Sequence, residues 1–139
     1  MLTAIFIRGG FIDIVQKADK AVFCGTLAIK SRVQLENGAV HYVQPGMPKI
    51  VDEVAQVTFS AAYAARAGQK VLYVTEAAVF GLDDDGLVLQ EIAPGVDIER
   101  DLIPQMGFRP RVSPDLTAMR AELFVDATLP ADVFARFGR

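Results

Sequence analysis

The sequence predicts an α/β domain with an inserted β-hairpin. Apolar runs typical of strands alternate with stretches whose apolar residues recur at helical spacing, and this interleaving is characteristic of α/β proteins. The dipeptide Asn37-Gly38 stands between two alternating segments, which is a strong hairpin signal. The 139 residues suit a single domain, 1–139, and 52% hydrophobic residues are enough to build a core.

The stretch Lys70–Gly107 is the centre of the predicted domain. An amphipathic helix is expected to start at Asp97, after three strands. Pro104 falls in the second turn of this helix, where proline removes a backbone donor, so we expect a kink or an early end near Ile103. The three strands are expected at Val71–Val74, Ala77–Leu82 and Leu87–Ile92.

Further elements are expected on both sides of this stretch. Those before it are a strand at Leu2–Ile7, a helix at Phe11–Ala18, a buried strand at Lys20–Thr26, hairpin strands at Arg32–Leu35 and Ala39–Val43, a loop at Pro45–Pro48, a strand at Val54–Phe59 and a helix from Ser60 to Ala67 that Gly68 ends. Those after it are a short extended piece at Val112–Pro114, a helix at Asp115–Phe124 and a tail over 126–139.

Charge and composition exclude several classes of function. The net charge is −3 and no basic block occurs, which argues against a nucleic-acid partner. The opening MLTAIFI is too short to span a bilayer and lacks a basic region and a cleavage site, so no membrane association is expected. A single cysteine cannot form an internal disulfide, so the reducing cytoplasm is the expected location.

Several motifs resemble the C-terminal part of family I coenzyme A transferases, the acetate and 3-oxoacid type. They include GGFIDI, KADKAVFCGT, VLYVTE, EIAPG and QMGF, in the family's order and at consistent spacing. The resemblance covers about Gly9 to Leu116, yet only the last quarter of a complete transferase. It implies a partial Rossmann-like CoA-transferase C-terminal domain, with the hairpin as an insertion and 126–139 as a tail outside the family pattern.

The resemblance also implies an activity. These enzymes move coenzyme A between an acyl-CoA and a short-chain carboxylic or 3-oxo acid, as in ketone-body metabolism, with coenzyme A as substrate and no cofactor. A glutamate attacks the thioester, forms an anhydride and is captured as a glutamyl thioester. A carboxylate is a weak nucleophile, so the reaction needs exact positioning and stabilisation of the developing oxyanion.

Glu36 is the tempting candidate for this nucleophile. It lies in Leu35-Glu36-Asn37-Gly38, which is similar to the family's Ser-Glu-Asn-Gly motif. The family's catalytic glutamate, however, lies upstream of the segment that resembles Gly9, whereas Glu36 lies downstream of it. We therefore interpret Glu36 as a hairpin-turn residue, place no catalytic residue in this chain and expect the isolated chain to be inactive.

The best candidates for contact with coenzyme A or the acyl group are Gly9, Gly10 and Phe11. Glycines between a strand and a helix let backbone N–H groups approach an anion. The family has a Gly-x-Gly-Gly-Phe segment here, but Ile7 replaces its first glycine and Arg8 replaces a small residue. A purely structural turn is an equal alternative.

Other reactive side chains have structural interpretations. Cys24 is expected to be a small core residue, and His41 a surface residue of the hairpin. Asp83-Asp84-Asp85-Gly86 lacks the spacing of a calcium loop and is expected to form a solvated turn, so no metal site is predicted. Capping and the helix dipole explain the acidic residues Asp97, Glu99 and Asp101.

Three functions remain open. The chain could form one wall of a transferase site whose glutamate comes from a partner chain. It could be a non-catalytic module that associates with itself or a partner and binds a small anion or coenzyme A. A weaker possibility is a hydrolase or binding protein that uses Arg8 and the Gly-Gly turn. Because an incomplete sheet leaves an open edge, we expect a homo-oligomer or a complex rather than a monomer.

Overall fold

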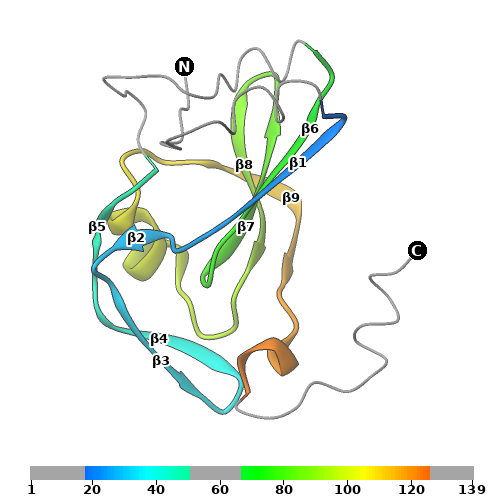
Figure 1. Cartoon of the computed structure of the whole chain (residues 1–139). Helices are drawn as coiled ribbons and strands as arrows, with labels where there is room; N and C mark the ends of the chain where they lie inside the picture. The colour runs from blue at the N-terminus through cyan, green and yellow to red at the C-terminus, as the bar shows by residue number, and fades with distance from the viewer. Residues whose placement is uncertain (1–17, 51–66, 126–139) are drawn as a thin grey trace.

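The computed structural model describes residues 18–50 and 67–125 (Figure 1). Four expected elements fall largely or wholly outside these ranges, together with the tail over 126–139: the strand at Leu2–Ile7, the helix at Phe11–Ala18, the strand at Val54–Phe59 and the helix that starts at Ser60. Within the described ranges, no helix has the length and apolar character needed to cross a membrane.

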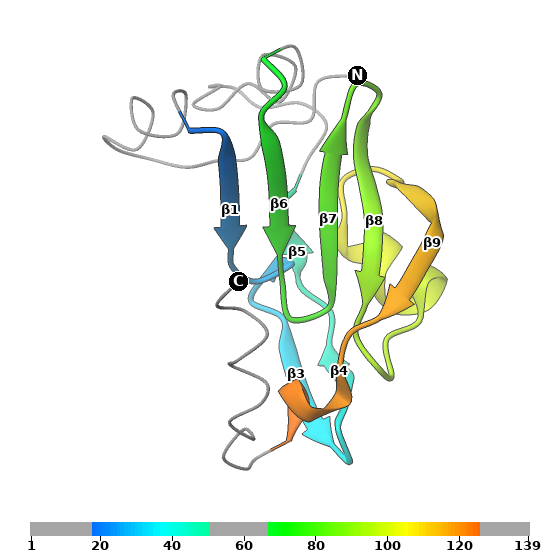
Figure 2. The same ribbon diagram turned by 90° about the vertical axis from the view of Figure 1, so that its right-hand side faces the viewer.

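A five-stranded mixed sheet forms the centre of the fold, in the order β1-β6-β7-β8-β9 (Figure 2). Parallel β1 and β6 pair from Lys20↔Lys70 to Cys24↔Val74, and β8 and β9 are also parallel, whereas β6, β7 and β8 form an antiparallel meander. Parallel pairs need crossover connections, which agrees with the α/β class predicted from the sequence. The strands are β1 (Lys20–Cys24), β6 (Lys70–Val74), β7 (Ala78–Asp83), β8 (Gly86–Ile92) and β9 (Arg111–Ala118).

A long two-stranded ribbon leaves the sheet after β1 and returns before residue 51 (Figure 1). Its outer part is the predicted hairpin, in which Asn37 and Gly38 have φ of 51° and 75°, as a tight two-residue turn requires. The expected loop at Pro45–Pro48 is wrong at its end, because Ile29 pairs with Met47 there. The ribbon strands are β2 (Ala28–Ile29), β3 (Arg32–Glu36), β4 (Ala39–Gln44) and β5 (Met47–Pro48).

A smaller buried cluster around Val40, Val79 and Phe124 lies on one face of the sheet, and the main core lies on the other face. Alternate residues of each strand point into it, as the period of two requires. On β1, Phe23 stacks on Tyr73 with ring centroids 5.1 Å apart. Cys24 is the next residue along, so it points to the other face and is exposed, and the expectation of a buried core cysteine is wrong. The largest fully buried hydrophobic side chains are Phe80, Leu27, Leu89, Leu102 and Val40.

The helical turn after β8 begins as predicted, with Asp97 as its N-cap. It is a π-turn, η1 (Ile98–Leu102), in which Leu102 N–H donates to the Asp97 carbonyl at 3.2 Å. A 3-10 turn, η2 (Ile103–Gln105), follows with Pro104 in its first turn. The predicted early end near Ile103 is confirmed, although the element is a short pair of wide and tight turns rather than an amphipathic α-helix.

The expected helix at Asp115–Phe124 is wrong over its first half. Strand β9 continues to Ala118, because Thr117 and Ala118 pair with Glu91 and Ile92 of β8. Only Ala121–Phe124 is helical, as the 3-10 turn η3. Pairing with a neighbouring strand has overridden the helical spacing of the apolar residues, and Pro114 is tolerated because β9 is at the edge of the sheet.

Candidate functional site at the carboxyl ends of β1 and β6

The residues predicted to contact coenzyme A, Gly9, Gly10 and Phe11, lie outside the described residues. The described part of the chain offers the carboxyl ends of the parallel strands β1 and β6, the edge of an α/β sheet where ligands usually bind. These two ends are joined by a hydrogen bond of 3.0 Å from Gly25 N–H to the Val74 carbonyl.

Glu76, two residues after the end of β6, is the central polar residue at this edge. Its Oε2 accepts from Leu27 N–H at 2.9 Å, and its Oε1 accepts from the Tyr42 hydroxyl at 2.6 Å. The buried Thr75 fixes the turn that carries Glu76, since its Oγ1 accepts from Ala77 N–H and Ala78 N–H at 3.2 and 3.0 Å. One carboxylate thus ties the end of β1 and the ribbon strand β4 to the β6–β7 turn.

Tyr42 holds its proton firmly in this arrangement. Burial of the phenol raises its pKa well above the ordinary value, and the neighbouring Glu76 carboxylate raises it further because a phenolate there would be repelled. Tyr42 is therefore a neutral hydrogen-bond donor. With both of its oxygens engaged by fixed donors, Glu76 can orient the surrounding segments but is not a free nucleophile.

Gln105 links the same ribbon to the helical turns. Its side chain is 1% exposed, its Oε1 accepts from Gly46 N–H at 2.9 Å, and its Nε2 donates to the Asp101 carbonyl at 2.7 Å. The glycine is required for this contact, because a Cβ at Gly46 would lie 2.6 Å from the Ile29 carbonyl oxygen. The ribbon is therefore fixed to the rest of the domain by two polar side chains, Glu76 and Gln105.

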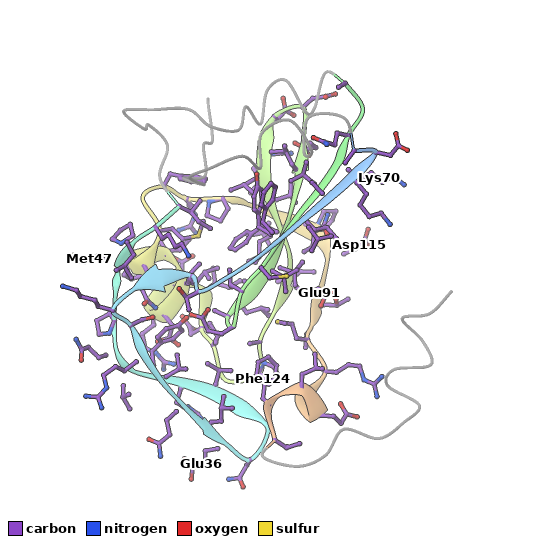
Figure 3. The ribbon with its side chains drawn as sticks, in the orientation of Figure 1. Glu36, Met47, Lys70, Glu91, Asp115 and Phe124 are labelled. Atoms are coloured by element: carbon purple, nitrogen blue, oxygen red, sulfur yellow. The ribbon has the colours of Figure 1, made fainter. Side chains whose placement is uncertain are left out.

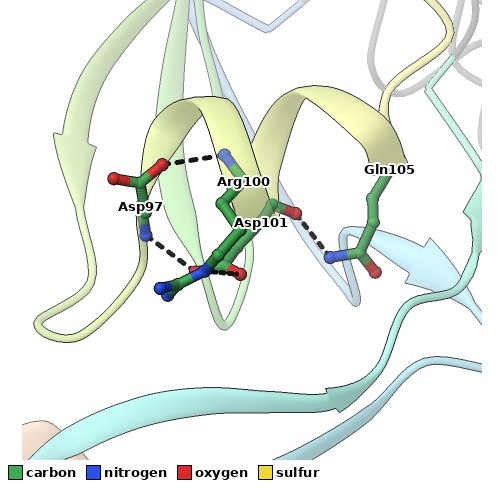
Figure 4. A network of polar contacts seen from close by, with 4 residues as sticks. All are labelled: Asp97, Arg100, Asp101 and Gln105. Atoms are coloured by element: carbon green, nitrogen blue, oxygen red, sulfur yellow. Dashed lines mark hydrogen bonds and ion pairs between the residues drawn. The ribbon is translucent and has the colours of Figure 1, made fainter.

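The acidic residues at the start of η1 have the capping role predicted for them (Figure 4). Asp97 Oδ1 accepts from Arg100 N–H at 2.7 Å, and Asp101 Oδ2 accepts from Asp97 N–H at 2.9 Å. The Arg100 guanidinium donates to both oxygens of Asp101, which holds the pKa of this carboxyl below its usual range. Glu99 forms an exposed ion pair with Arg109 instead.

Two further side chains lie at the same edge as Glu76. Cys24 ends β1 and is exposed, and Lys49 lies over the next residue, since a Cβ at Gly25 would be 3.3 Å from the Lys49 Nζ. Lys49 brings a positive charge to the carboxyl end of β1. A cation at this position could attract an anionic ligand, although Lys49 is itself on the exposed surface.

The remaining candidates are spread over the molecule. Glu36 lies at the far end of the hairpin (Figure 3), opposite Ala39 and exposed, as expected of a turn residue. His41 is an exposed residue of β4, also as expected. Asp83 ends β7 and Asp85 lies in the turn before β8, and both pair with Arg111. Across residues 18–50 and 67–125, no three His, Cys, Asp or Glu side chains gather closely enough to hold a metal ion.

The sequence did not single out Glu76, Tyr42 or Gln105. Tyr42 lies 34 positions before Glu76 in the sequence, and Gln105 lies 29 positions after it. These three side chains come close together only because the ribbon folds back. A sequence signal existed for Glu76 alone, because a carboxylate just beyond the end of a parallel strand lies at the ligand-binding edge.

Known proteins with similar sequences share this fold. Acetate CoA-transferase YdiF of Escherichia coli K12 is 45% identical over 123 residues, which is 87% of this chain, and caffeate CoA-transferase of Acetobacterium woodii is 44% identical over 117 residues. The chain is homologous to one quarter of a coenzyme A transferase. A scan against protein-family models finds no match.

The solved structures agree with the sequence comparison. The acyl-CoA transferase YdiF of E. coli O157:H7, crystallised as a thioester complex with CoA, superposes with a TM-score of 0.82 at 45% identity, over 87% of this chain and 24% of that chain. Its apoenzyme superposes with a TM-score of 0.81. The resemblance to the transferase family and the α/β fold are thereby confirmed. The chain spans about a quarter of the length of these relatives.

Proposed function

We propose that this single-domain chain forms one wall of a coenzyme A transferase site and acts with a partner polypeptide that supplies the catalytic glutamate. The observation that carries the proposal is the 45% identity over 87% of the chain to only 23% of an acetate CoA-transferase. The substrates would be an acyl-CoA and a short-chain carboxylic or 3-oxo acid, in the cytoplasm. Gly9, Gly10 and Phe11 would contact the coenzyme A thioester or its acyl group.

The position of Glu36 supports the need for a partner. It is the last residue of β3, directly before the two-residue turn at the tip of the hairpin, and it is exposed and far along the ribbon from the sheet. A carboxylate attacking a thioester needs a water-poor setting with donors for the oxyanion. Glu76, the half-buried alternative, already accepts two hydrogen bonds from the protein.

Acyl transfer from acetyl-CoA to a carboxylate tests this function. The chain alone should show no turnover. Addition of a polypeptide carrying the other three quarters of E. coli YdiF should restore it, and Gly10→Val should reduce that restored activity. Robust turnover by the chain alone that is lost in Glu36→Ala would overturn the proposal.

A non-catalytic module is the second candidate, because Ile7 and Arg8 depart from the glycine and small residue of the family segment. Such a module would associate with itself or a partner and bind coenzyme A or a small anion without turnover. Binding of coenzyme A to the reconstituted complex, measured by calorimetry with no activity at any ratio of the two chains, would favour it.

A further inference from the structure

The hairpin strand β3 carries an apolar face that the rest of the described chain leaves uncovered. All five of its residues are exposed, although Val33 and Leu35 alternate with polar neighbours as in a half-buried strand. Val33 is 39% exposed and Leu35 is 51% exposed. We call this pair the β3 apolar face.

The register shows which side of the hairpin this face belongs to. Val33 lies opposite Tyr42 and Leu35 opposite Val40, so the four side chains share one side of the ribbon. The β4 half of that side is covered, since Val40 is 1% exposed and packs with Val79 and Phe124. The β3 half extends past this cover. Val33 and Leu35 therefore continue the apolar side of the hairpin past the residues of the described chain that cover Val40.

Other exposed apolar residues gather on the same ribbon and beside its tip. Five of the nine large hydrophobic side chains that are exposed in the described residues lie on the ribbon, and two more lie in or directly after η3, which packs against β4 (Figure 2). Val43 alternates with Tyr42 and so lies on the other side of the ribbon, but the concentration of exposed apolar residues on this projecting element still indicates an interaction surface. These seven are Ile29, Val33, Leu35, Val43, Met47, Leu123 and Val125.

We propose that the β3 apolar face is the docking surface for the polypeptide that corresponds to the other three quarters of the relatives' length. The relatives share this fold at a TM-score of 0.82 and continue for about three times its length, so the extra polypeptide has to pack against some surface of this domain. A stable interface buries roughly 800 Å² on each partner, and its centre is apolar. This inference rests on the proposed function and adds to it the surface that the partner contacts.

A chimera tests the docking surface without relying on two separate chains. In E. coli YdiF, the matched quarter is replaced by this chain carrying Cys24→Ser and Leu35→Cys, and the rate of thiol labelling at position 35 is compared with that in the isolated chain. We expect labelling in the chimera to be at least about tenfold slower, because a covered thiol is inaccessible to reagent. The chimera without the introduced cysteine gives the background.

Gln34→Cys is the matched control, because Gln34 lies on the opposite side of the same strand, opposite His41, and both are exposed. Its labelling rate should be the same in the two proteins within about twofold. Equal labelling of position 35 in chimera and isolated chain would overturn the docking surface, as would equal protection of positions 34 and 35.

Two other occupants of the face are separate outcomes of the same measurement. Slow labelling of position 35 in the isolated chain at all concentrations would mean that a segment of the same chain outside the described residues covers it, and protection that rises with concentration would mean a second copy. Either result would overturn the proposal. Labelling needs no turnover, so an inactive chimera that protects position 35 would count against the proposed activity and leave the docking surface standing.

Discussion

The central sheet and the ribbon are built from the same kind of sequence yet differ in how far they are buried. On β7, Phe80 is fully buried, whereas Leu35 on β3 is 51% exposed. Both are apolar residues of antiparallel strands, but β7 has a paired strand on each side and a packed core on its face, while β3 pairs with β4 alone. The alternation of apolar and polar residues therefore shows which side of a strand is suited to burial. The number of neighbouring elements decides whether that side is actually buried.

Truncation of one residue from each region gives the largest expected contrast. Phe80→Ala should lower the free energy of unfolding by about 3–5 kcal/mol, because it leaves a cavity in the core. Leu35→Ala should change it by less than about 0.5 kcal/mol, as at other exposed sites. Urea denaturation of the two variants measures both values. A large loss in Leu35→Ala would show that the ribbon is covered in solution and would remove the contrast.

Gly46 tests the junction between the two regions. In Gly46→Ala the new Cβ would lie 2.6 Å from the Ile29 carbonyl oxygen and 2.8 Å from the Ala28 Cβ, and neither neighbour is a flexible side-chain end. We expect a loss of about 1–3 kcal/mol, as for other overpacked sites. Gly25→Ala is the matched control, since neither Gly25 nor Gly46 has a left-handed φ and a Cβ at Gly25 would meet only the flexible end of the Lys49 side chain, at 3.3 Å. A Gly46→Ala loss no larger than that of the control would mean that the ribbon can shift freely.

Two tyrosines, one in each region, should respond in opposite directions. Tyr42→Phe removes the 2.6 Å donor to Glu76 and should cost about 1.5–3 kcal/mol, the range for hydrogen bonds to charged groups. Tyr73 has a buried hydroxyl with no hydrogen-bond partner among the described residues. Tyr73→Phe should therefore raise stability, by about 1 kcal/mol or less. Thermal unfolding of both variants measures the two changes in stability. Destabilisation by Tyr73→Phe would contradict a Tyr73 hydroxyl without a hydrogen-bond partner among the described residues.

Alkaline pH tests the protonation of the same two hydroxyl groups. Burial raises the pKa of Tyr42 and of Tyr73 above the ordinary value of 10.0. Below pH 10 both are protonated in the folded and unfolded chain, so their contribution is constant. Above pH 10 the unfolded chain releases protons that the folded chain keeps, and stability falls as pH rises. The fall, followed by urea denaturation from pH 9 to 11, should be shallower in Tyr42→Phe than in the parent, and equal slopes would contradict a raised pKa for Tyr42.

Local signals in the sequence were sufficient for most of the described strands. The strands at Lys20, Ala39 and Leu87 are found within about two residues of their predicted bounds, because runs of β-branched and aromatic residues between turn residues are a local property. The turn at Asn37-Gly38 and the cap at Asp97 follow from single residues whose backbone preferences are strong. The family could be recognised from motif spacing alone, and the relatives at 45% identity confirm it.

Contacts between distant segments decided what the sequence could not. The apolar spacing around Leu116 fits a helix, but pairing with β8 holds Arg111–Ala118 extended. Cys24 is a free cysteine in an apolar strand, which suggested a core residue. The alternation of side chains along β1 turns it to the exposed face, while Phe23 packs on Tyr73. The meeting of Glu76, Tyr42 and Leu27 joins positions up to 49 residues apart. Backbone preferences act over a few residues and can be read locally, whereas pairing, burial and polar networks depend on which segments the folded chain brings together.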